Sequence, residues 1–393
     1  MTEELPENEQ RWSWLEIDLS AIRHNVEDAR AQLKPGTKLL AVVKADAYGH
    51  GAIECARAAI EAGAEYLGVA TVPEAVALRR AGITDTPLMI ISQPPAKTAP
   101  MLLEHHVMPA VYDVDFARAY NNAAKAAGVA APYHMAVNTG MNRIGVRWDE
   151  VVKFQQALTD CDALQLAGTF THFATADCPA TDQFETQVER FTQAIDSLRA
   201  VGINPGIVHA ANSASIWRYP QVHFDMVRLG ISLYGFPACP EVAGIANLRP
   251  AMSVHTRITD TRTVEPGDGV SYGLHYNPAP YERVCTVPVG YADGLRRGLS
   301  SSTNFIWNGR LCRQVGNICM DQCMFVVDTR PDENSNVANP QEGDEVLIVG
   351  GEGDAQVTIT EMAEKLGSID HEIAIGFAQR MPRVYKGQLA KAK

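Results

Sequence analysis

The stretch that decides the fold runs from residue 41 to residue 51: Ala-Val-Val-Lys-Ala-Asp-Ala-Tyr-Gly-His-Gly. A short apolar run ends in Lys44, and a turn of small residues around Tyr48 follows it. This order predicts a buried strand with a lysine at its carboxyl end. Similar apolar runs follow, and segments of helical periodicity separate them. Strands that alternate with helices predict a parallel sheet, and eight such units predict a (β/α)8 barrel. An open, doubly wound sheet is the alternative.

The eight predicted strands are short and apolar, and each is followed by polar or small residues. They are expected at residues 39–44, 66–71, 88–92, 108–112, 133–138, 166–172, 207–213 and 226–233. Helical periodicity predicts helices at residues 52–62, 73–81, 116–127 and 181–201.

After about residue 235 the pattern changes to strands punctuated by Gly, Pro, Asn and Asp. Strands are expected at residues 253–264, 283–290, 305–318, 323–328 and 345–349. One helix, at residues 359–366, follows Thr358, and Glu361 completes a capping box. The chain is therefore predicted to have a barrel at residues 12–245 and a mainly β domain at residues 246–388. An early strand at residues 14–18 is a candidate to pair with the second domain.

Composition excludes several classes of function. The formal net charge of −12 argues against nucleic acid, because a phosphate backbone needs a basic face. No apolar run reaches the length of a membrane span. The polar residues 1–10 have no signal-peptide pattern. The eight cysteines are scattered, which favours reduced thiols in the cytoplasm and predicts no metal site.

Polar residues gather where several predicted strands end, as they do at barrel active sites. A lysine that is desolvated at such a position has a lowered pKa and can form a Schiff base. The alternative interpretation of Lys44 is a solvated lysine at a strand end. His172, His209 and Arg228 follow or end other strands. Taken singly, the two histidines are more often structural, and Arg228 is more often an ion-pair partner.

Taken in order, these segments resemble the alanine racemase family over residues 12–385. The resemblance rests on residues 41–51, on Thr139-Gly140-Met141-Asn142-Arg143, and on residues 171–177, 212–213, 227–235 and 270–273, together with Gly290-Tyr291-Ala292-Asp293-Gly294 and Cys319-Met320-Asp321-Gln322. The resemblance implies a barrel plus a β domain, racemisation of alanine, and pyridoxal phosphate as cofactor.

The resemblance also implies a role for individual residues. Lys44 would hold the cofactor and would serve as the base on one face of the substrate, with Tyr272 on the other face. The remaining cofactor-binding residues would be Tyr48, Arg143, His172, His209, Ser213, Arg228, Gly230 and Ile231. The substrate would lie near Arg143, Met320, Tyr291 and Asp321.

Three further expectations follow from the resemblance. Tyr272 would come from a second copy, which makes the protein a homodimer with shared active sites. Arg228 would donate to the pyridine nitrogen, and because a guanidinium keeps its protons, that nitrogen would stay unprotonated. Such a weak electron sink favours racemisation over transamination or decarboxylation. The product, D-alanine, would supply cell-wall peptidoglycan.

The chain departs from the family at two places. Many members carry a carbamylated lysine that orients the arginine equivalent to Arg143; here Ala136 and Asn138 occupy this segment. A buried Arg143 without an anionic partner would be unfavourable, so a chloride ion is expected near Arg143 and Asn138. Some relatives have a tyrosine where Gln379 stands, and its absence would enlarge the substrate pocket.

Three alternatives stay open. A broad-specificity amino-acid racemase is the first, and both departures point toward it. A barrel decarboxylase is the second, but such enzymes place a carboxylate where Arg228 stands. The third is a pyridoxal-phosphate carrier without catalysis, which the long stretch after residue 235 opposes.

Overall fold

The computed structural model describes residues 10–178, 181–331, 337–377 and 380–387. The chain divides into two compact units. The first unit comprises residues 21–47 and 51–249, and the second comprises residues 1–20, 48–50 and 250–393. The predicted domain boundary between residues 245 and 246 stays a prediction.

The first unit is a closed parallel barrel. Its described strands follow the order β5-β4-β3-β2-β10-β9-β8-β6, and pairing between β5 and β6 closes the ring. They are β2 (Lys38–Val42), β3 (Tyr66–Val69), β4 (Leu88–Ile90), β5 (Val107–Val111), β6 (Ala131–Asn138), β8 (Leu164–Phe170), β9 (Ile207–His209) and β10 (Met226–Leu229). The short β7 (Val146–Arg147) pairs with the end of β6. The predicted (β/α)8 barrel is therefore confirmed.

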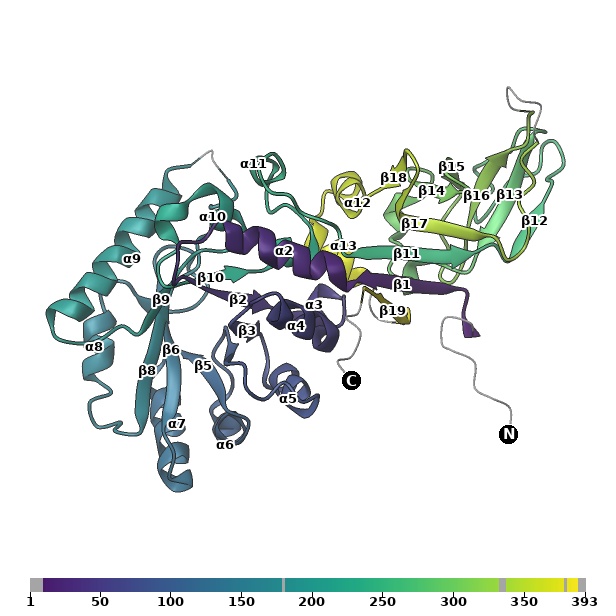
Figure 1. Ribbon diagram of the computed structural model, residues 1–393. Coiled ribbons are helices and arrows are strands. Elements are labelled where there is room, and N and C mark those ends of the chain that lie inside the picture. Colours follow the sequence, from purple (N-terminus) through teal and green to yellow (C-terminus); the bar gives the residue numbers. More distant parts are fainter. Residues whose placement is uncertain (1–9, 179–180, 332–336, 378–379, 388–393) are drawn as a thin grey trace, which may run out of the picture. The chain divides into compact units, whose positions relative to one another are not determined.

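Helices alternate with the strands and lie outside them (Figure 1). They include α2 (Leu19–Ala31), α4 (Ala52–Glu61), α5 (Val72–Arg80), α6 (Ala99–Glu104), α7 (Val114–Ala127), α8 (Val151–Gln156), α9 (Gln183–Ala200) and α10 (Ser213–Arg218). Asp113 caps α7 through the Phe116 amide, and Gly128 ends it in a left-handed conformation. The four predicted helices of this unit are confirmed within two residues at each end.

Most barrel strands end two or more residues before the predicted limit. The strand β2 stops at Val42, where the Tyr234 hydroxyl donates to the Val42 carbonyl at 2.8 Å. Lys44 therefore lies beyond the strand, at the start of a turn. The shortening places Lys44 and His172 after their strands, at the carboxyl side of the barrel, whereas His209 ends β9 and Arg228 lies in β10. Barrel enzymes assemble their sites at this side.

The second unit is mainly β, as predicted. Its strand order is β12-β13-β16-β15-β14-β17-β11-β1-β19, with β18 paired to β17. The strands are β1 (Ser13–Asp18), β11 (Met252–Arg257), β12 (Asp260–Arg262), β13 (Glu282–Val287), β14 (Asn304–Trp307), β15 (Arg310–Val315), β16 (Cys323–Asp328), β17 (Glu345–Glu352), β18 (Ala355–Val357) and β19 (Arg383–Lys386). The early strand β1 pairs antiparallel with β11 and parallel with β19.

The prediction is wrong for two long strands of this unit, since each segment forms two shorter strands. Residues 305–318 form a hairpin of β14 and β15, because Asn308 and Gly309 both adopt positive φ angles of 51° and 69°. An Asn-Gly pair between two apolar runs is typical of this tight turn. Residues 253–264 form β11 and β12, and these strands pair with β17 and β13 respectively.

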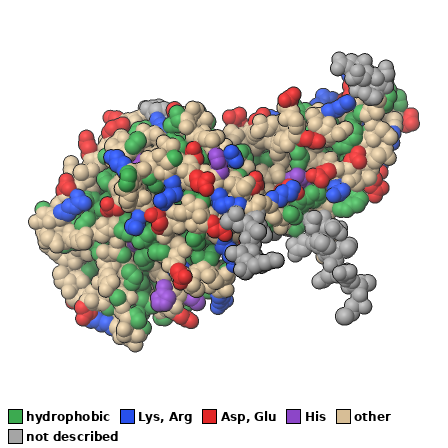
Figure 2. All heavy atoms as spheres, viewed as in Figure 1, with side chains coloured by type: hydrophobic (Ala, Val, Ile, Leu, Met, Phe, Trp, Pro, Cys, Tyr) green, Lys and Arg blue, Asp and Glu red, His purple; other side chains and the backbone are tan. Residues whose placement is uncertain are grey.

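The helix predicted at residues 359–366 is confirmed as α12 (Ile359–Leu366), with the Thr358–Glu361 capping box in place. A second helix, α13 (Asp370–Gly376), was not predicted. On the face shown in Figure 2, acidic and basic side chains are interspersed over the first unit. No helix within the described ranges is long and apolar enough to cross a membrane.

Candidate active site

Lys44 begins a left-handed turn at the carboxyl end of β2. In α3 (Lys44–Tyr48), residues 45–48 all have positive φ angles, between 51° and 54°. Residues other than glycine adopt this conformation at a cost of roughly 1–2 kcal/mol each. Four such residues in succession therefore require compensation from the surrounding backbone, and backbone strain of this kind concentrates at functional sites.

Glu74 and Asp46 supply much of that compensation. Glu74 is the third residue of α5, where it completes a capping box with Thr71. One oxygen of Glu74 accepts from the Ala45 amide at 2.8 Å, and its other oxygen accepts from the Ala70 amide at 2.8 Å. Asp46 accepts from the Ala52 amide at 2.8 Å. The turn after Lys44 is thereby tied to the start of two helices.

The surroundings of Lys44 favour a neutral amine. Burial lowers the pKa of Lys44 below its usual value, and the Arg143 guanidinium lowers that pKa further, while Glu74 partly opposes both effects. A lysine of this kind is a better nucleophile and a better base near neutral pH than a solvated one. The interpretation of Lys44 as a merely solvated strand-end lysine is therefore disfavoured.

Arg228 lies inside the barrel, on β10, and is 5% exposed. Its Nη1 lies 3.0 Å from His209 Nδ1, and its Nη2 lies 3.1 Å from His172 Nδ1. Nη2 also donates to the carbonyls of Thr171 and Ala210, at 2.8 and 3.0 Å. Burial and Arg143 lower the pKa of Arg228 to about 9, which leaves the guanidinium protonated at neutral pH.

Arg228 fixes the protons of three histidines. A guanidinium only donates, so His209 and His172 must accept at Nδ1 and carry their protons at Nε2. His209 Nε2 lies 2.9 Å from His134 Nδ1, so His209 donates there and His134 carries its proton at Nε2. Space for His134 depends on Gly168, because a Cβ at that position would lie 2.4 Å from His134 Nδ1. The four side chains form one connected chain of hydrogen bonds with a single consistent proton assignment.

Burial, reinforced by Arg228, lowers the pKa of each of these histidines. The pKa of His134 falls to about 4 and that of His172 to about 3, while that of His209 falls well below 6.5. All three imidazoles are neutral at pH 7. Protonation of His209 or His172 at Nδ1 would remove the acceptor that Arg228 requires.

These pKa shifts predict a loss of stability in mild acid. Above pH 6.5 the histidines are neutral in both states and add nothing to the pH dependence. Below pH 6.5 the unfolded chain binds protons that the folded chain excludes, so the free energy of unfolding decreases as pH falls toward 4. Each histidine contributes about 1.4 kcal/mol per pH unit in that window. Urea midpoints at pH 7.5, 6.5, 5.5 and 4.5 measure the effect.

The exposed His106 supplies the control. His106→Asn keeps a residue that tolerates the positive φ angle of 49° at that position. Its urea midpoints are expected to follow those of the unchanged protein at every pH. A midpoint that stays constant between pH 6.5 and 4.5 would show that the buried histidines titrate normally.

Ser213 lies beside the Gly230–Ile231 segment, and the phosphate role of these three residues stays a prediction. The Ser213 hydroxyl oxygen accepts from the Gly230 amide at 3.0 Å and from the Ser232 amide at 3.4 Å. With its oxygen so occupied, the hydroxyl retains its proton to donate outward. Tyr48 belongs to the second unit, and burial raises its pKa to about 12, so its hydroxyl also remains a donor.

The prediction of a buried Arg143 is wrong for the single chain, since Arg143 is exposed. Ala136 is buried in β6 opposite Phe170. The Asn138 side chain is occupied by the loop itself: its oxygen accepts from the amides of Gly140 and Asn142, each at 3.1 Å. The single chain therefore does not bury the Arg143 guanidinium without a partner. Gln379 lies outside the described residues.

The residues predicted to contact substrate from the β unit lie on neighbouring, exposed loops. The exposed fractions are 75% for Tyr272, 53% for Met320 and 40% for Tyr291. The Tyr291 amide donates to the Cys319 carbonyl at 3.0 Å, and the Ala292 amide donates to the Met320 carbonyl at 3.0 Å. Tyr291 and Met320 are therefore held together through their backbones.

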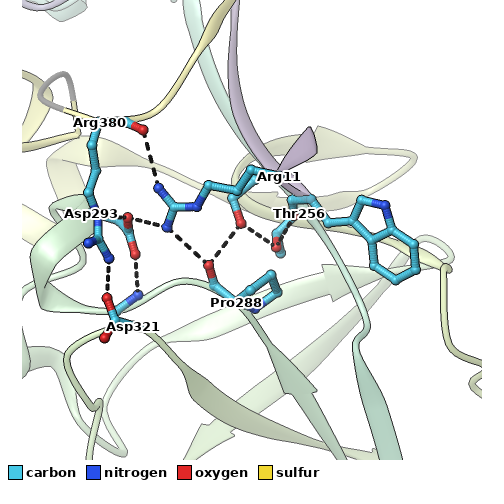
Figure 3. Close-up of polar contacts among 9 residues, drawn as sticks. Arg11, Thr256, Pro288, Asp293, Asp321 and Arg380 are labelled. Atoms are coloured by element: carbon cyan, nitrogen blue, oxygen red, sulfur yellow. Dashed lines mark hydrogen bonds and ion pairs between the residues drawn. The ribbon is translucent and has the colours of Figure 1, made fainter. Parts of the chain in front are cut away.

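A buried carboxylate braces these loops (Figure 3). Asp293, with a fully buried side chain, pairs with Arg11 and with Arg380, whose Nε lies 2.8 Å away. Arg380 also pairs with Asp321, and the second oxygen of Asp293 accepts from the Gly290 amide at 2.9 Å. The network joins the loop of Tyr291 to the loop of Met320 and Asp321. The sequence contained no pattern that singles out Arg11 or Arg380 as its members.

The residues of the first unit fit pyridoxal phosphate. The positive charge of Arg143 lowers the pKa values of both Lys44 and Arg228, so a bound anion would be favoured near these three side chains. Arg228 Nε makes no hydrogen bond among the described residues, and this donor suits a pyridine nitrogen. The Ser213 hydroxyl suits a phosphate oxygen. Lys44, with its lowered pKa, suits covalent attachment of an aldehyde.

The comparisons with known proteins agree with this chemistry. Residues 17–237 match the family model described as "Alanine racemase, N-terminal domain", and residues 251–385 match "Alanine racemase, C-terminal domain". An alanine racemase of Symbiobacterium thermophilum is 40% identical over 380 residues, which cover 97% of this chain and 98% of that protein.

Solved structures give the same result. The alanine racemase of Bacillus anthracis with bound L-Ala-P is 34% identical, with a TM-score of 0.88 and 96% of each chain covered. A histidine racemase of Leuconostoc mesenteroides is 28% identical, with a TM-score of 0.85, and covers 95% of this chain and 98% of its own. By sequence and by fold, this chain belongs to the alanine racemase family of isomerases.

Proposed function

We propose that this protein interconverts L- and D-alanine with pyridoxal phosphate, and that Lys44 and Tyr272 act as the two bases. Membership of the family supports racemisation of alanine. The observation that supports the cofactor chemistry best is Arg228, a buried cation whose described partners are neutral imidazoles and carbonyls. Such a group offers hydrogen bonds without giving up a proton.

When bound, the cofactor held by Lys44 would supply an acceptor for the electron pair of the Cα–H bond of the amino acid. Lys44 then holds or releases a proton at Nζ on one face of Cα, and Tyr272 does the same at Oη on the other face. A lowered pKa raises the neutral fraction of Lys44 at a given pH. Racemisation follows when one base removes the proton and the other base delivers one to the opposite face.

Arg228 limits the chemistry to proton transfer. Because its guanidinium stays protonated and the neighbouring His209 and His172 stay neutral, no group beside it can protonate a pyridine nitrogen at neutral pH. A carboxylate at this position would favour the decarboxylase alternative. The proposed roles of Tyr48, Ser213, Gly230 and Ile231 are to hold the phosphate, and those of Met320, Tyr291 and Asp321 are to hold the substrate.

We also propose that the protein acts as a homodimer. Tyr272, Leu274 and Met320 are all more than half exposed on the second unit. The loops of these residues adjoin, since Asn317 Nδ2 donates to the Tyr272 carbonyl. Large apolar side chains exposed on adjoining loops are typical of an interface. A second copy seated there would cover them and would bring Tyr272 to the Lys44 of its partner. Supply of D-alanine for peptidoglycan and a cytoplasmic location remain proposals from the resemblance and from the cysteine content.

A small anion such as chloride is proposed near Arg143 and Asn138. Ala136 has no group that can hold Arg143, and Arg143 makes no ion pair among the described residues. Crystals grown in bromide are expected to show an anomalous peak beside Arg143. A site without density, or one lined only by apolar groups, would argue against the anion.

Chiral chromatography after incubation with separate L-amino acids tests the substrate. We expect the cofactor-loaded protein to racemise alanine, with Lys44→Ala as the inactive control. Serine, lysine or arginine turned over at comparable rates would favour the broad-specificity alternative. The histidine racemase of Leuconostoc mesenteroides shares this fold, which gives a reason to test substrates other than alanine. Cofactor binding without any turnover would favour the carrier.

A further inference from the structure

Tyr272 occupies a strained turn. Its neighbours Ser271 and Leu274 have positive φ angles of 67° and 52°, and Gly273 has one of 80°. The Leu274 amide donates to the Ser271 carbonyl at 3.0 Å and closes the turn. Two residues other than glycine in the left-handed region persist only where other contacts compensate for the strain.

Asn317 supplies those contacts from the adjoining loop. The Ser271 hydroxyl donates to the Asn317 carbonyl at 2.6 Å, and Asn317 Nδ2 donates to the Tyr272 carbonyl at 2.6 Å. The two loops approach closely, because a Cβ on Gly316 would lie 2.7 Å from Ser271 Cβ. These two reciprocal hydrogen bonds, from Ser271 and from Asn317, are termed the clasp below.

The clasp continues into the loop of the substrate residues. Two positions after Asn317, the Cys319 carbonyl accepts from the Tyr291 amide, and the Met320 carbonyl accepts from the Ala292 amide. One short segment, residues 317–320, therefore sets the backbone of Tyr272, Tyr291 and Met320 together. In the single chain Tyr272 is 75% exposed, so this backbone sets the point and direction from which its side chain leaves the turn.

We propose that Asn317 and Ser271 are positioning residues for Tyr272, and that the clasp aims its hydroxyl for proton transfer on one face of the substrate. This proposal rests on the proposed function of Tyr272 as a base. Proton transfer tolerates little displacement, and a shift near 1 Å can lower a rate about 100-fold. Two short hydrogen bonds to a strained turn are a means of preventing such a shift.

The test measures the two faces separately. L-alanine and D-alanine are each incubated with the holoenzyme in deuterium oxide, and the initial rate of deuterium incorporation at Cα is followed by NMR. Tyr272→Phe identifies the Tyr272-dependent rate. Asn317→Ala is expected to lower that same rate about 10-fold and to leave the Lys44-dependent rate within about 2-fold.

Asn277→Ala is the matched control. Asn277 Nδ2 also donates to backbone carbonyls in this region, those of Gly267 and Asp268, but makes no bond to Tyr272. We expect both rates to be unchanged in this variant. A readout independent of activity is amide hydrogen exchange of residues 265–280, which should be faster in Asn317→Ala than in the unchanged protein.

Ser271→Gly provides a second variant that cannot fail through strain, since glycine adopts a positive φ freely. It removes the hydroxyl donor and should also lower the Tyr272-dependent rate selectively. Two outcomes would overturn the positioning role of the clasp and leave Tyr272 as a base. The first is an equal loss of the exchange rate on both faces. The second is no loss in Asn317→Ala or Ser271→Gly while Tyr272→Phe is impaired. If Tyr272→Phe leaves both rates unchanged, the assignment of Tyr272 fails, and the positioning proposal fails with it.

Discussion

Replacement of Lys44 by alanine is expected to lower the rate of alanine racemisation by a factor of about 10⁴. The variant loses the amine that would hold the cofactor and the base on one face of Cα. No other lysine is available at the end of β2, and Arg143 and Arg228 cannot replace Lys44 as a base because they keep their protons. The fold should survive, since the turn after Lys44 is held by Glu74 and Asp46.

Chiral chromatography measures the loss, and mass spectrometry after borohydride reduction measures the attachment. The unchanged protein should retain one cofactor adduct on the peptide of Lys44, and Lys44→Ala should retain none. Lys38→Ala is the matched control, because Lys38 begins the same strand at the opposite end. If Lys44→Ala keeps more than about a tenth of the activity, Lys44 is not a base in the sense proposed.

The fold was predictable because its signals are local and repeated. Each barrel strand is a short apolar run, and the alternation with helices leaves few topologies. The limits of the strands were less predictable, since hydrogen bonds such as that from Tyr234 to Val42 join residues far apart in sequence. The hairpin at Asn308 and Gly309 was predictable, because an Asn-Gly pair favours a two-residue turn between two strands.

The candidate site was predictable only where a residue type implies chemistry. Lys44, Arg228 and His209 were identified on that basis or by resemblance. His134 was missed, because one histidine in a predicted strand carries no signal until Gly168 is seen to leave room for it. Asn317 was missed for a similar reason, since its bond to the Tyr272 carbonyl crosses 45 positions of sequence.

Replacement of Tyr272 by phenylalanine is expected to lower racemisation by a factor of about 10²–10⁴, the usual contribution of one general base. The aromatic ring stays, so only the hydroxyl is lost. Lys44 can still remove and return a proton on its own face, so deuterium incorporation should continue with one enantiomer of alanine. Equal loss of exchange with both enantiomers would contradict a two-base mechanism.

The same variant tests whether Tyr272 acts in a neighbouring copy. Lys44→Ala and Tyr272→Phe proteins are unfolded together, mixed in equal amounts and refolded, so that about half of the dimers are hybrids. If each site takes Lys44 from one copy and Tyr272 from the other, every hybrid contains one site with both residues intact. The mixture should then regain about a quarter of the unchanged activity.

If Tyr272 acts on the Lys44 of its own chain, no site in the hybrid has both residues, and the mixture stays inactive. Because Tyr272 is 75% exposed in the single chain, and because the resemblance implies that it acts in a neighbouring copy, we expect the recovered activity.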